Sequence, residues 1–236
     1  MKKVVLVVPV YNEEKILDKS IGRLHDYFKR NIFYDWEILI ADNGSSDKTG
    51  KIADKLSERF SQVRVLHLTG RGRGLALREA WSKSRADALG YCDVDLATDI
   101  SYIKPLFDAI IKDGYDISMG NRYIFGAVAK RDLRRLIYSK IYIWMVRVFF
   151  KTKITDFQCG FKAVGPKVVN ELLKKVRDNK WFFDSELLLL AERRGYKIKQ
   201  LPVKWQETRV EDSRVRVFDI FIDYLRGLIR LKGKLG

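Results

Sequence analysis

Short apolar segments alternate with helical patterns along the first half of the chain, and this alternation limits the possible folds more than any other feature. The apolar segments cover residues 4–8, 37–41, 63–68 and the stretch that begins at Gly90, and turn residues follow each of them. Strands and helices that alternate at this spacing form a mostly parallel sheet with helices on both faces. We therefore expect an α/β, Rossmann-like fold whose first strand closes at Pro9.

Polar residues follow each predicted strand at the point where it ends. Tyr11-Asn-Glu-Glu14 follows the first strand, Asp42 the second, and a Gly-rich basic turn at 69–74 the third. After the fourth come Asp93 and Asp95, which would project together because side chains at i and i+2 leave a strand on one face. Ligands of open parallel sheets bind beyond the carboxyl ends of the strands. Two carboxylates at that edge are suited to hold a hard divalent cation against a phosphate.

Composition favours a globular protein of enzyme size. The 236 residues, 47% of them hydrophobic, can bury one substantial core, and without a linker or repeat we expect a single domain over 1–236. The two cysteines, Cys92 and Cys159, are too few for a disulfide framework and suit a reducing compartment. The longest stretch without charge, 4–12, is far shorter than the roughly 20 residues of a membrane-spanning helix, so no spanning segment is expected.

The charge of the chain is strongly unbalanced, with 46 Lys and Arg against 30 Asp and Glu and a net charge of +16. Such an excess favours an anionic partner. No helix-turn-helix, zinc or RNA-recognition signature accompanies the charge, so nucleic acid is not the expected partner.

Two segments combine basic residues with a wide apolar face. Residues 127–153 hold eight basic residues and one acid among aromatic and aliphatic side chains. We expect an interfacial amphipathic helix at about 130–151 that lies on an anionic membrane surface, and a second amphipathic helix at about 215–232. The alternative for both is an ordinary core helix with a charged edge.

Further polar clusters lie in the second half of the chain. One predicted strand leads to Arg122, and a Gly-containing turn holds Asp156. The helical pattern 186–194 follows Asp184, which is suited either to cap that helix or to take part in chemistry. Segment 200–207 contains a proline, which predicts an edge strand.

Two sets of motifs resemble known glycosyltransferases. Those of the first half are similar to family 2 glycosyltransferases, which have the GT-A fold: Pro9-x-Tyr11-Asn12-Glu13, Asp42-x-Gly44-Ser45-x-Asp47-x-Thr49 and Asp93-x-Asp95. Those of the second half resemble the dolichyl-phosphate β-glucosyltransferases, with the dolichyl-phosphate mannose synthases as near relatives: Thr155–Lys162, Trp181–Leu188 and Val203–Glu207. The resemblance covers nearly the whole chain.

The resemblance implies an inverting, metal-dependent hexosyltransferase. A hexose would pass from a nucleotide sugar, with UDP-glucose favoured, to dolichyl or another polyprenyl phosphate, with Mg²⁺ or Mn²⁺ as the cofactor. The enzyme would be peripheral on the cytoplasmic face of a membrane. Three alternatives stay open: GDP-mannose as the donor, a sugar hydroxyl as the acceptor, and a membrane-associated nucleotide-binding protein without turnover.

The resemblance also implies roles for individual residues. Those expected to bind the nucleotide are Pro9, Tyr11, Glu13, Asp42, Arg73 and Asp93. The expected metal ligands are Asp93 and Asp95, and the expected catalytic residues are Asp95 and Asp156. The acceptor phosphate is assigned to Arg122, Arg135 and Ser139, and a loop that closes on the donor to Arg209, Ser213 and Arg214. The chain departs from the family pattern at Asn43, Ala97 and Asp212.

The chemistry of such a transfer follows from the charges involved. A nucleoside diphosphate leaves as an anion, which a cation held by carboxylates stabilises. A lipid phosphate is already ionised, so it needs positioning by arginine forks and no general base. A sugar hydroxyl would need a base, for which Asp156, Asp184 and Glu186 are candidates. His25 lies in a helical pattern and His67 in a strand, so we expect structural roles for both.

Overall fold

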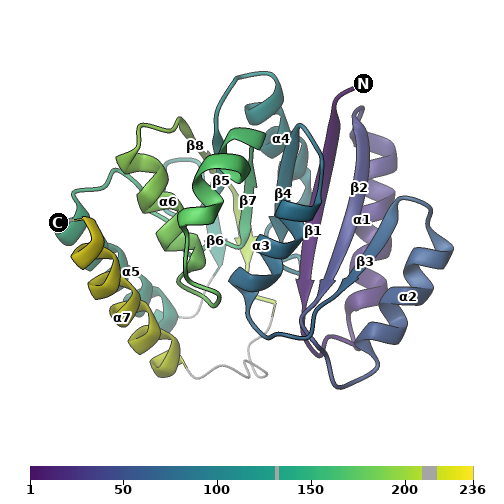
Figure 1. Ribbon diagram of the computed structural model, residues 1–236, viewed down its shortest axis with the longest axis horizontal. Helices are drawn as coiled ribbons and strands as arrows, with labels where there is room; N and C mark the ends of the chain where they lie inside the picture. Colours follow the sequence, from purple (N-terminus) through teal and green to yellow (C-terminus); the bar gives the residue numbers. More distant parts are fainter. Residues whose placement is uncertain (131–132, 209–216, 236) are drawn as a thin grey trace.

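The computed structural model describes residues 1–130, 133–208 and 217–235 (Figure 1). Its main sheet has seven strands in the order β3-β2-β1-β4-β7-β5-β8. These strands are β1 (Lys3–Val10), β2 (Asp35–Asp42), β3 (Val63–His67), β4 (Ala88–Cys92), β5 (Ile117–Asn121), β7 (Phe161–Val164) and β8 (Ile198–Pro202). Within this sheet only β7 runs against its neighbours, β4 and β5. A second, parallel pair consists of β6 (Val128–Lys130) and β9 (Lys204–Gln206).

Helices cover both faces of the sheet. They are α1 (Leu17–Asn31), α2 (Thr49–Arg59), α3 (Arg73–Lys83), α4 (Ile103–Ile111), α5 (Leu133–Phe150), α6 (Phe183–Arg193) and α7 (Val217–Leu235), with short turns at η1 (Ile100–Tyr102), η2 (Val168–Leu172) and η3 (Leu173–Lys175). Because side chains alternate along a strand, β1 feeds two cores. Val5 and Val7 join the core of α3, α5, α6 and α7, while Val4 and Leu6 join that of α1, α2 and α4. The expected α/β architecture is confirmed.

The first strand continues through Pro9, so the prediction that it closes there was wrong. β1 pairs with β2 as far as Val10, whereas its pairing with β4 stops at Val7. The carbonyl of Val10 accepts from the backbone N–H of Asn43 on the β2 side. Since successive residues of a strand point their backbone groups to opposite sides, the nitrogen of Pro9 faces the side that β4 no longer occupies. The missing N–H therefore costs the sheet no hydrogen bond.

The predicted edge strand at 200–207 divides at Pro202. β8 ends at this proline and pairs with β5 alone, which confirms the edge position. The chain then forms β9 in the small second sheet. The helix predicted at 186–194 begins earlier, at Phe183, and Gly195 follows its end with φ of 72°.

Helices α5 and α7 lie side by side at the lower left of Figure 1, at the far end of the molecule from β3. The rings of Tyr142 and Tyr224 join them, with centroids 4.6 Å apart. The two helices lie in the segments where amphipathic helices are predicted, at about 130–151 and 215–232, and α5 has apolar side chains on its exposed side as well as on its buried side. Among the described residues, no helix combines the length and the apolar character needed to cross a bilayer.

The strand order reverses between β1 and β4. From β1 the chain builds β2 and β3 on one side and then crosses to β4 on the other. Open parallel sheets bind ligands at such a reversal, beyond the carboxyl ends of the strands. The segments after β1, β2 and β4 therefore define where a site is expected.

Candidate functional site

Hydrogen bonds tie together the two turns that follow β1 and β2. The backbone N–H of Asn12 donates to Ser45 Oγ over 3.0 Å, and Ser45 in turn donates to Asp42 Oδ1 through its N–H and its hydroxyl. The side-chain carbonyl of Asn12 accepts from the N–H of Ser46 over 2.8 Å. Asn12 adopts a left-handed backbone conformation with φ of 55°. The structure thus joins the two motifs that the sequence assigns to the nucleotide.

The remaining residues predicted to bind the nucleotide lie around these turns. Tyr11 is partly exposed, and the guanidinium carbon of Arg71 lies 4.9 Å from its ring centre. The N–H of Glu13 donates to Thr49 Oγ1 over 2.7 Å, which fixes the backbone beside it. Asp42 is 4% exposed. A partly exposed aromatic ring beside a buried carboxylate is an arrangement suited to an aromatic base with ring N–H groups.

The Gly-rich turn before α3 packs against the segment that precedes α6. The N–H of Gly74 donates to the carbonyl of Lys180 over 3.2 Å, and that of Leu75 to the carbonyl of Asn179 over 3.0 Å. A side chain at Gly72 would overlap the carbonyl of Asn179. These backbone donors are therefore used within the protein. The cationic side chains of this turn are Arg71, which is exposed, and Arg73.

Arg73 lies between two carboxylates. Its Nη2 is 3.1 Å from Asp93 Oδ1 and 3.9 Å from Asp184 Oδ2. Asp184 also accepts from the hydroxyl of Tyr91 and pairs with the buried Lys162 over 3.2 Å. Burial alone would lower the pKa of Arg73, but the two carboxylates raise it, so the guanidinium stays charged. Asp184 does not cap α6, one of the two roles expected for it.

Asp93 and Asp95 lie in a turn just beyond β4. The N–H of Leu96 donates to the carbonyl of Asp93, so strand alternation does not set the directions of the two side chains. Asp95 Oδ1 accepts from the N–H of Ala97 over 3.1 Å, and its Oδ2 from the hydroxyl of Thr208 over 2.9 Å. A side chain at Gly160 would overlap the carboxylate of Asp93. The glycine lets β7 approach this turn closely.

The donor atoms of this turn fit a hard divalent cation. Asp93 and Asp95 supply carboxylate oxygens, the ligands that Mg²⁺ and Mn²⁺ prefer. Within residues 1–130, 133–208 and 217–235, no cluster of three or more His, Cys, Asp or Glu side chains is arranged to hold a metal. Cations held by one or two carboxylates usually complete their coordination with substrate phosphates and water. The two aspartates are therefore suited to a metal that arrives with a diphosphate.

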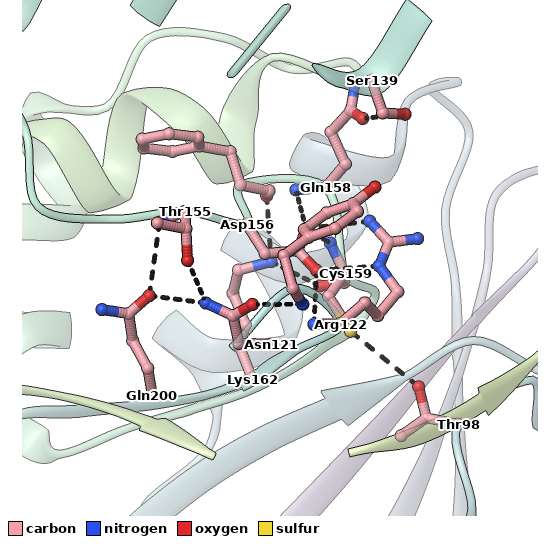
Figure 2. Close-up of polar contacts among 12 residues, drawn as sticks. Thr98, Asn121, Arg122, Ser139, Thr155, Asp156, Gln158, Cys159, Lys162 and Gln200 are labelled. Carbon is pink, nitrogen blue, oxygen red and sulfur yellow. Dashed lines mark hydrogen bonds and ion pairs between the residues drawn. The ribbon is translucent and has the colours of Figure 1, made fainter. Parts of the chain in front are cut away.

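Arg122 and Asp156, predicted from separate motifs, form one buried pair (Figure 2). Arg122 Nε and Nη2 each lie 2.8 Å from a carboxylate oxygen of Asp156, and the N–H of Arg122 donates to it over 3.0 Å. Burial alone would raise the pKa of Asp156, but Arg122 holds it below its usual range. Asp156 is thus an ionised, fully occupied carboxylate, which suits it to hold Arg122 and not to accept a proton.

The other acceptor and donor-loop residues are described only in part. Ser139, on α5, donates to Gln158 Oε1 over 3.2 Å, which places it beside the turn of Asp156 (Figure 2). Arg135 belongs to α5 one turn earlier, and its side chain lies outside the described part. The predicted loop residues Arg209, Ser213 and Arg214 also lie outside the described residues.

Sequence reasoning missed three residues of this region. Lys162 is fully buried on β7, where it donates to the carbonyls of Phe157 and Cys159 and pairs with Asp184. Tyr91 contacts the same carboxylate, and Thr208 contacts Asp95. A lysine inside the apolar run Phe161–Val164 was the one available signal, because a lysine is almost never fully buried without a partner.

The site and the fold together define a glycosyltransferase of GT-A type. The sequence model of the family described as glycosyl transferase family 2 matches residues 5–173, so the chain belongs to this family. Its fold is similar to that of glucosyl-3-phosphoglycerate synthase from Mycobacterium tuberculosis, crystallised with Mn²⁺, UDP and glucosyl-3-phosphoglycerate, with a TM-score of 0.73 at 16% identity. That similarity covers 98% of this chain and 80% of the other.

Curated relatives are more similar in sequence. Glycosyltransferase AglD of Haloferax volcanii is 34% identical over 89% of this chain and 34% of its own length. The dolichyl-phosphate beta-glucosyltransferases of Dictyostelium discoideum and Homo sapiens are each 29% identical, over 96% and 92% of this chain and 73% and 71% of their own. The chain thus spans about a third of the first relative and about seven tenths of the other two.

Proposed function

We propose that this protein transfers a hexose, with inversion, from a nucleotide sugar to a polyprenyl phosphate at a membrane surface. UDP-glucose is the favoured donor and dolichyl phosphate the favoured acceptor type, because relatives that match over most of the chain are named dolichyl-phosphate beta-glucosyltransferases and a protein of similar fold is crystallised with UDP. The observation that carries the proposal is the placement of Arg73 against Asp93 at the strand reversal, 3.1 Å apart. A cation and carboxylates at that point match a diphosphate and its metal.

The donor would bind across the ends of β1, β2 and β4. Tyr11 would stack on the base and Asp42 would accept from it, with Pro9 and Glu13 beside the ribose. Asp93 and Asp95 would hold Mg²⁺ or Mn²⁺ against the diphosphate. When bound, such an ion stabilises the negative charge that grows on the leaving group. Arg73 would add a fixed positive charge to the same oxygens.

The acceptor phosphate would approach from the side of α5. Two nitrogens of Arg122 contact Asp156, and we assign the third, Nη1, to the acceptor phosphate. Ser139 lies beside the Asp156 turn, and Arg135 is one helical turn away from it on α5. An ionised phosphate attacks without a general base, so Asp156 serves to hold Arg122 in place. In-line attack on the side opposite the leaving diphosphate would invert the anomeric centre.

The exposed face of α5 favours peripheral binding to a membrane. Its exposed apolar side chains are Ile137, Tyr138, Ile141, Trp144, Val148 and Phe149. A groove of about 600 Å³ runs along the same helix and is lined by three cations, Lys140, Arg147 and Lys151, together with apolar groups such as Trp144. Aromatic groups with lysine and arginine at their border favour the headgroup layer of an anionic leaflet. We propose the cytoplasmic face of a membrane for this contact.

One incubation tests the function. Purified protein is mixed with polyprenyl phosphate, Mn²⁺ and a panel of radiolabelled nucleotide sugars, and the organic-extractable label is counted. Organic-extractable label from UDP-glucose supports the proposal. Such label from GDP-mannose alone would show that GDP-mannose is the donor instead. A labelled product that stays in the aqueous phase points to a sugar hydroxyl acceptor. The lack of any labelled product, whatever the donor, would overturn the proposal and favour the alternative of a nucleotide-binding protein without turnover.

A further inference from the structure

We propose that His67 positions the nucleotide-binding carboxylate of Asp42 and that the protonation of His67 makes nucleotide binding depend on pH. The inference rests on the proposed function, since it takes Asp42 as a contact of the donor's base. It goes beyond that function because it assigns a positioning role to a residue outside the family motifs.

His67 lies at the end of β3, between carboxylates of two other elements. Its Nδ1 is 3.3 Å from Asp42 Oδ2 on β2, and its Nε2 is 2.8 Å from Asp54 Oδ1 on α2. Gly50, on α2, makes room for this approach: a Cβ there would lie 3.1 Å from Asp42 Oδ2 and 3.6 Å from the imidazole ring. Asp42 is buried, whereas the side chain of His67 is 52% exposed and can exchange protons with solvent.

The contact with His67 is the outer end of a chain of hydrogen bonds. Asp42 holds Ser45 through its other oxygen, Oδ1, over 2.6 Å to the hydroxyl and 3.1 Å to the N–H. Ser45 Oγ accepts from the N–H of Asn12, which lies between Tyr11 and Glu13. A shift of the Asp42 carboxylate therefore moves both turns that would hold the base and ribose. His67 acts on the nucleotide only through Asp42.

The two contacts of His67 require its charged form. A neutral imidazole carries one N–H and one lone pair, so only the imidazolium donates to both carboxylates. The hydrogen bond to Asp54 raises the pKa of His67, burial opposes this, and the hydrogen bond to Asp42 adds to it. Within the described part of the chain, the charged groups that face the ring are Asp42 from β2 and Asp54 from α2. Above that raised pKa, the nearer Asp54 keeps the remaining proton and a lone pair turns toward Asp42.

The direction of the pH effect on nucleotide affinity follows from which protonation state of His67 supports Asp42. The imidazolium supports Asp42 at pH values below its pKa, and this support is lost as the pH rises through that value. Asp42 would then face a lone pair where it had a donor, so nucleotide affinity falls on the alkaline side. Asp54 lies on α2 away from the base, and it acts only by raising the pKa of His67.

The test is the affinity for UDP with a fixed excess of Mg²⁺, measured by calorimetry from pH 6 to pH 9 in wild type, His67→Gln and Asp54→Asn. Titration of UDP itself is common to all three proteins and cancels in their ratios. We expect the affinity of wild type for UDP to fall about fivefold relative to that of His67→Gln as the pH rises. A change of this size corresponds to the loss of one modest hydrogen bond. Asp54→Asn should move the midpoint of this loss to lower pH. Thermal unfolding at each pH checks that every variant is folded.

Each outcome decides the inference. A ratio of wild-type to His67→Gln affinity that falls with pH, with a midpoint that moves when Asp54→Asn replaces wild type, supports it, because a merely structural histidine would not give a shift that follows Asp54. Parallel profiles in wild type and His67→Gln overturn the inference and leave the proposed function standing. If no protein binds UDP at any pH, the proposed function fails and the inference fails with it.

Discussion

Arg122 and Asp156 form a two-point ion pair inside the protein, with two nitrogen–oxygen distances of 2.8 Å. The N–H groups of Gln158 and Cys159 also donate to Asp156, each over 3.2 Å. A carboxylate bound by this many donors holds the end of β5 and the turn before β7 in one arrangement. The pair therefore fixes where Arg122 can present its remaining N–H groups to an acceptor phosphate.

Asp156→Asn should destabilise the protein at neutral pH. It removes a buried charge and leaves Arg122 without its counter-charge, which typically costs about 3 kcal/mol. The free energy of unfolding from urea titrations measures the loss. Arg122→Met combined with Asp156→Asn should cost little more than Asp156→Asn alone, because the ion pair is already broken and the Asn oxygen still accepts from the backbone N–H groups. Losses that simply add in the double variant would contradict the pair's role.

The same pair gives stability a pH dependence. Because Arg122 lowers the pKa of Asp156 in the folded state, its contribution is fully present above the unfolded value and is lost as the pH falls toward the lowered one. The stability difference between wild type and Asp156→Asn should therefore shrink below about pH 4. An equal difference at pH 7 and pH 3 would show that the carboxylate contributes through packing alone.

Asp95→Asn should abolish sugar transfer while the fold persists. Asp95 is partly exposed and one of its oxygens contacts only Thr208, so little buried structure depends on its charge. We expect a loss of 100-fold or more, on the order of that seen when a transition-state charge contact is removed. Initial rates at saturating Mn²⁺ provide the measurement. Asp99→Asn, at an exposed position four residues further along the chain, is the matched control and should keep activity. If Asp95→Asn keeps activity near that of wild type, Asp95 is not a metal ligand.

Gly160→Ala should disrupt the site through space alone. A methyl group there would overlap the carboxylate of Asp93 and come within 2.6 Å of Arg73 Nη2. Asp93 must then move, so both UDP affinity and transfer should fall. Gly22→Ala is the control: nothing lies within 4 Å of its added carbon, and alanine in the middle of α1 should stabilise the protein by about 0.5–1 kcal/mol. Normal UDP binding by Gly160→Ala would show that Asp93 is not needed in its present place.

Substitutions at Ser139 and Arg135 should weaken acceptor binding and leave donor binding unchanged. Ser139→Ala and Arg135→Ala remove groups assigned to the lipid phosphate, so we expect the KM for polyprenyl phosphate to rise about tenfold. The affinity for UDP should stay unchanged, because both positions belong to α5 and not to the β1 and β2 turns. Steady-state kinetics with varied lipid, alongside UDP calorimetry, gives the two numbers. An equal loss of both would refute the acceptor assignment.

The double change Trp144→Ser and Val148→Ser should weaken membrane binding. Both side chains are more than half exposed on α5, and each can bury apolar area worth about 2 kcal/mol in the headgroup layer. Sedimentation with anionic vesicles should show at least a tenfold loss in partition, and high salt should weaken wild type as well. Phe33→Ser, at a still more exposed position before β2, should behave as wild type. Unchanged sedimentation of the double variant with vesicles would refute the proposed contact between α5 and the membrane.

Much of the fold was predictable because its signals are local. The period of the apolar residues predicts β1 to β4 and the helices between them, and turn residues mark where each strand ends. The antiparallel strand β7 was not predicted. Its four residues include Lys162, and a charge in so short a run hides the strand until Asp184 and Tyr91, from α6 and β4, are placed around it.

For the site too, the sequence predicted which residues belong to it but not which contacts they make. Asp93, Asp95 and Asp42 could be named from motifs, since each follows a strand directly and parallel strands bring their carboxyl ends to one edge. Which partner each side chain takes could not be named. Arg122 meets a carboxylate 34 positions away, and Asp184 meets Tyr91 across 93 positions.

The amino-acid sequence by itself determined the alternation of strands and helices, the family motifs and the basic, aromatic-rich character of α5, because these depend on residues close together in the chain. The tertiary structure alone decided that the N–H groups of Gly74 and Leu75 donate to the carbonyls of residues 179–180, that Asp156 is occupied by Arg122, and that His67 contacts Asp42 and Asp54 at once. The physical reason is that a polar group's function depends on which donors and acceptors remain unsatisfied, and packing between distant segments sets that number.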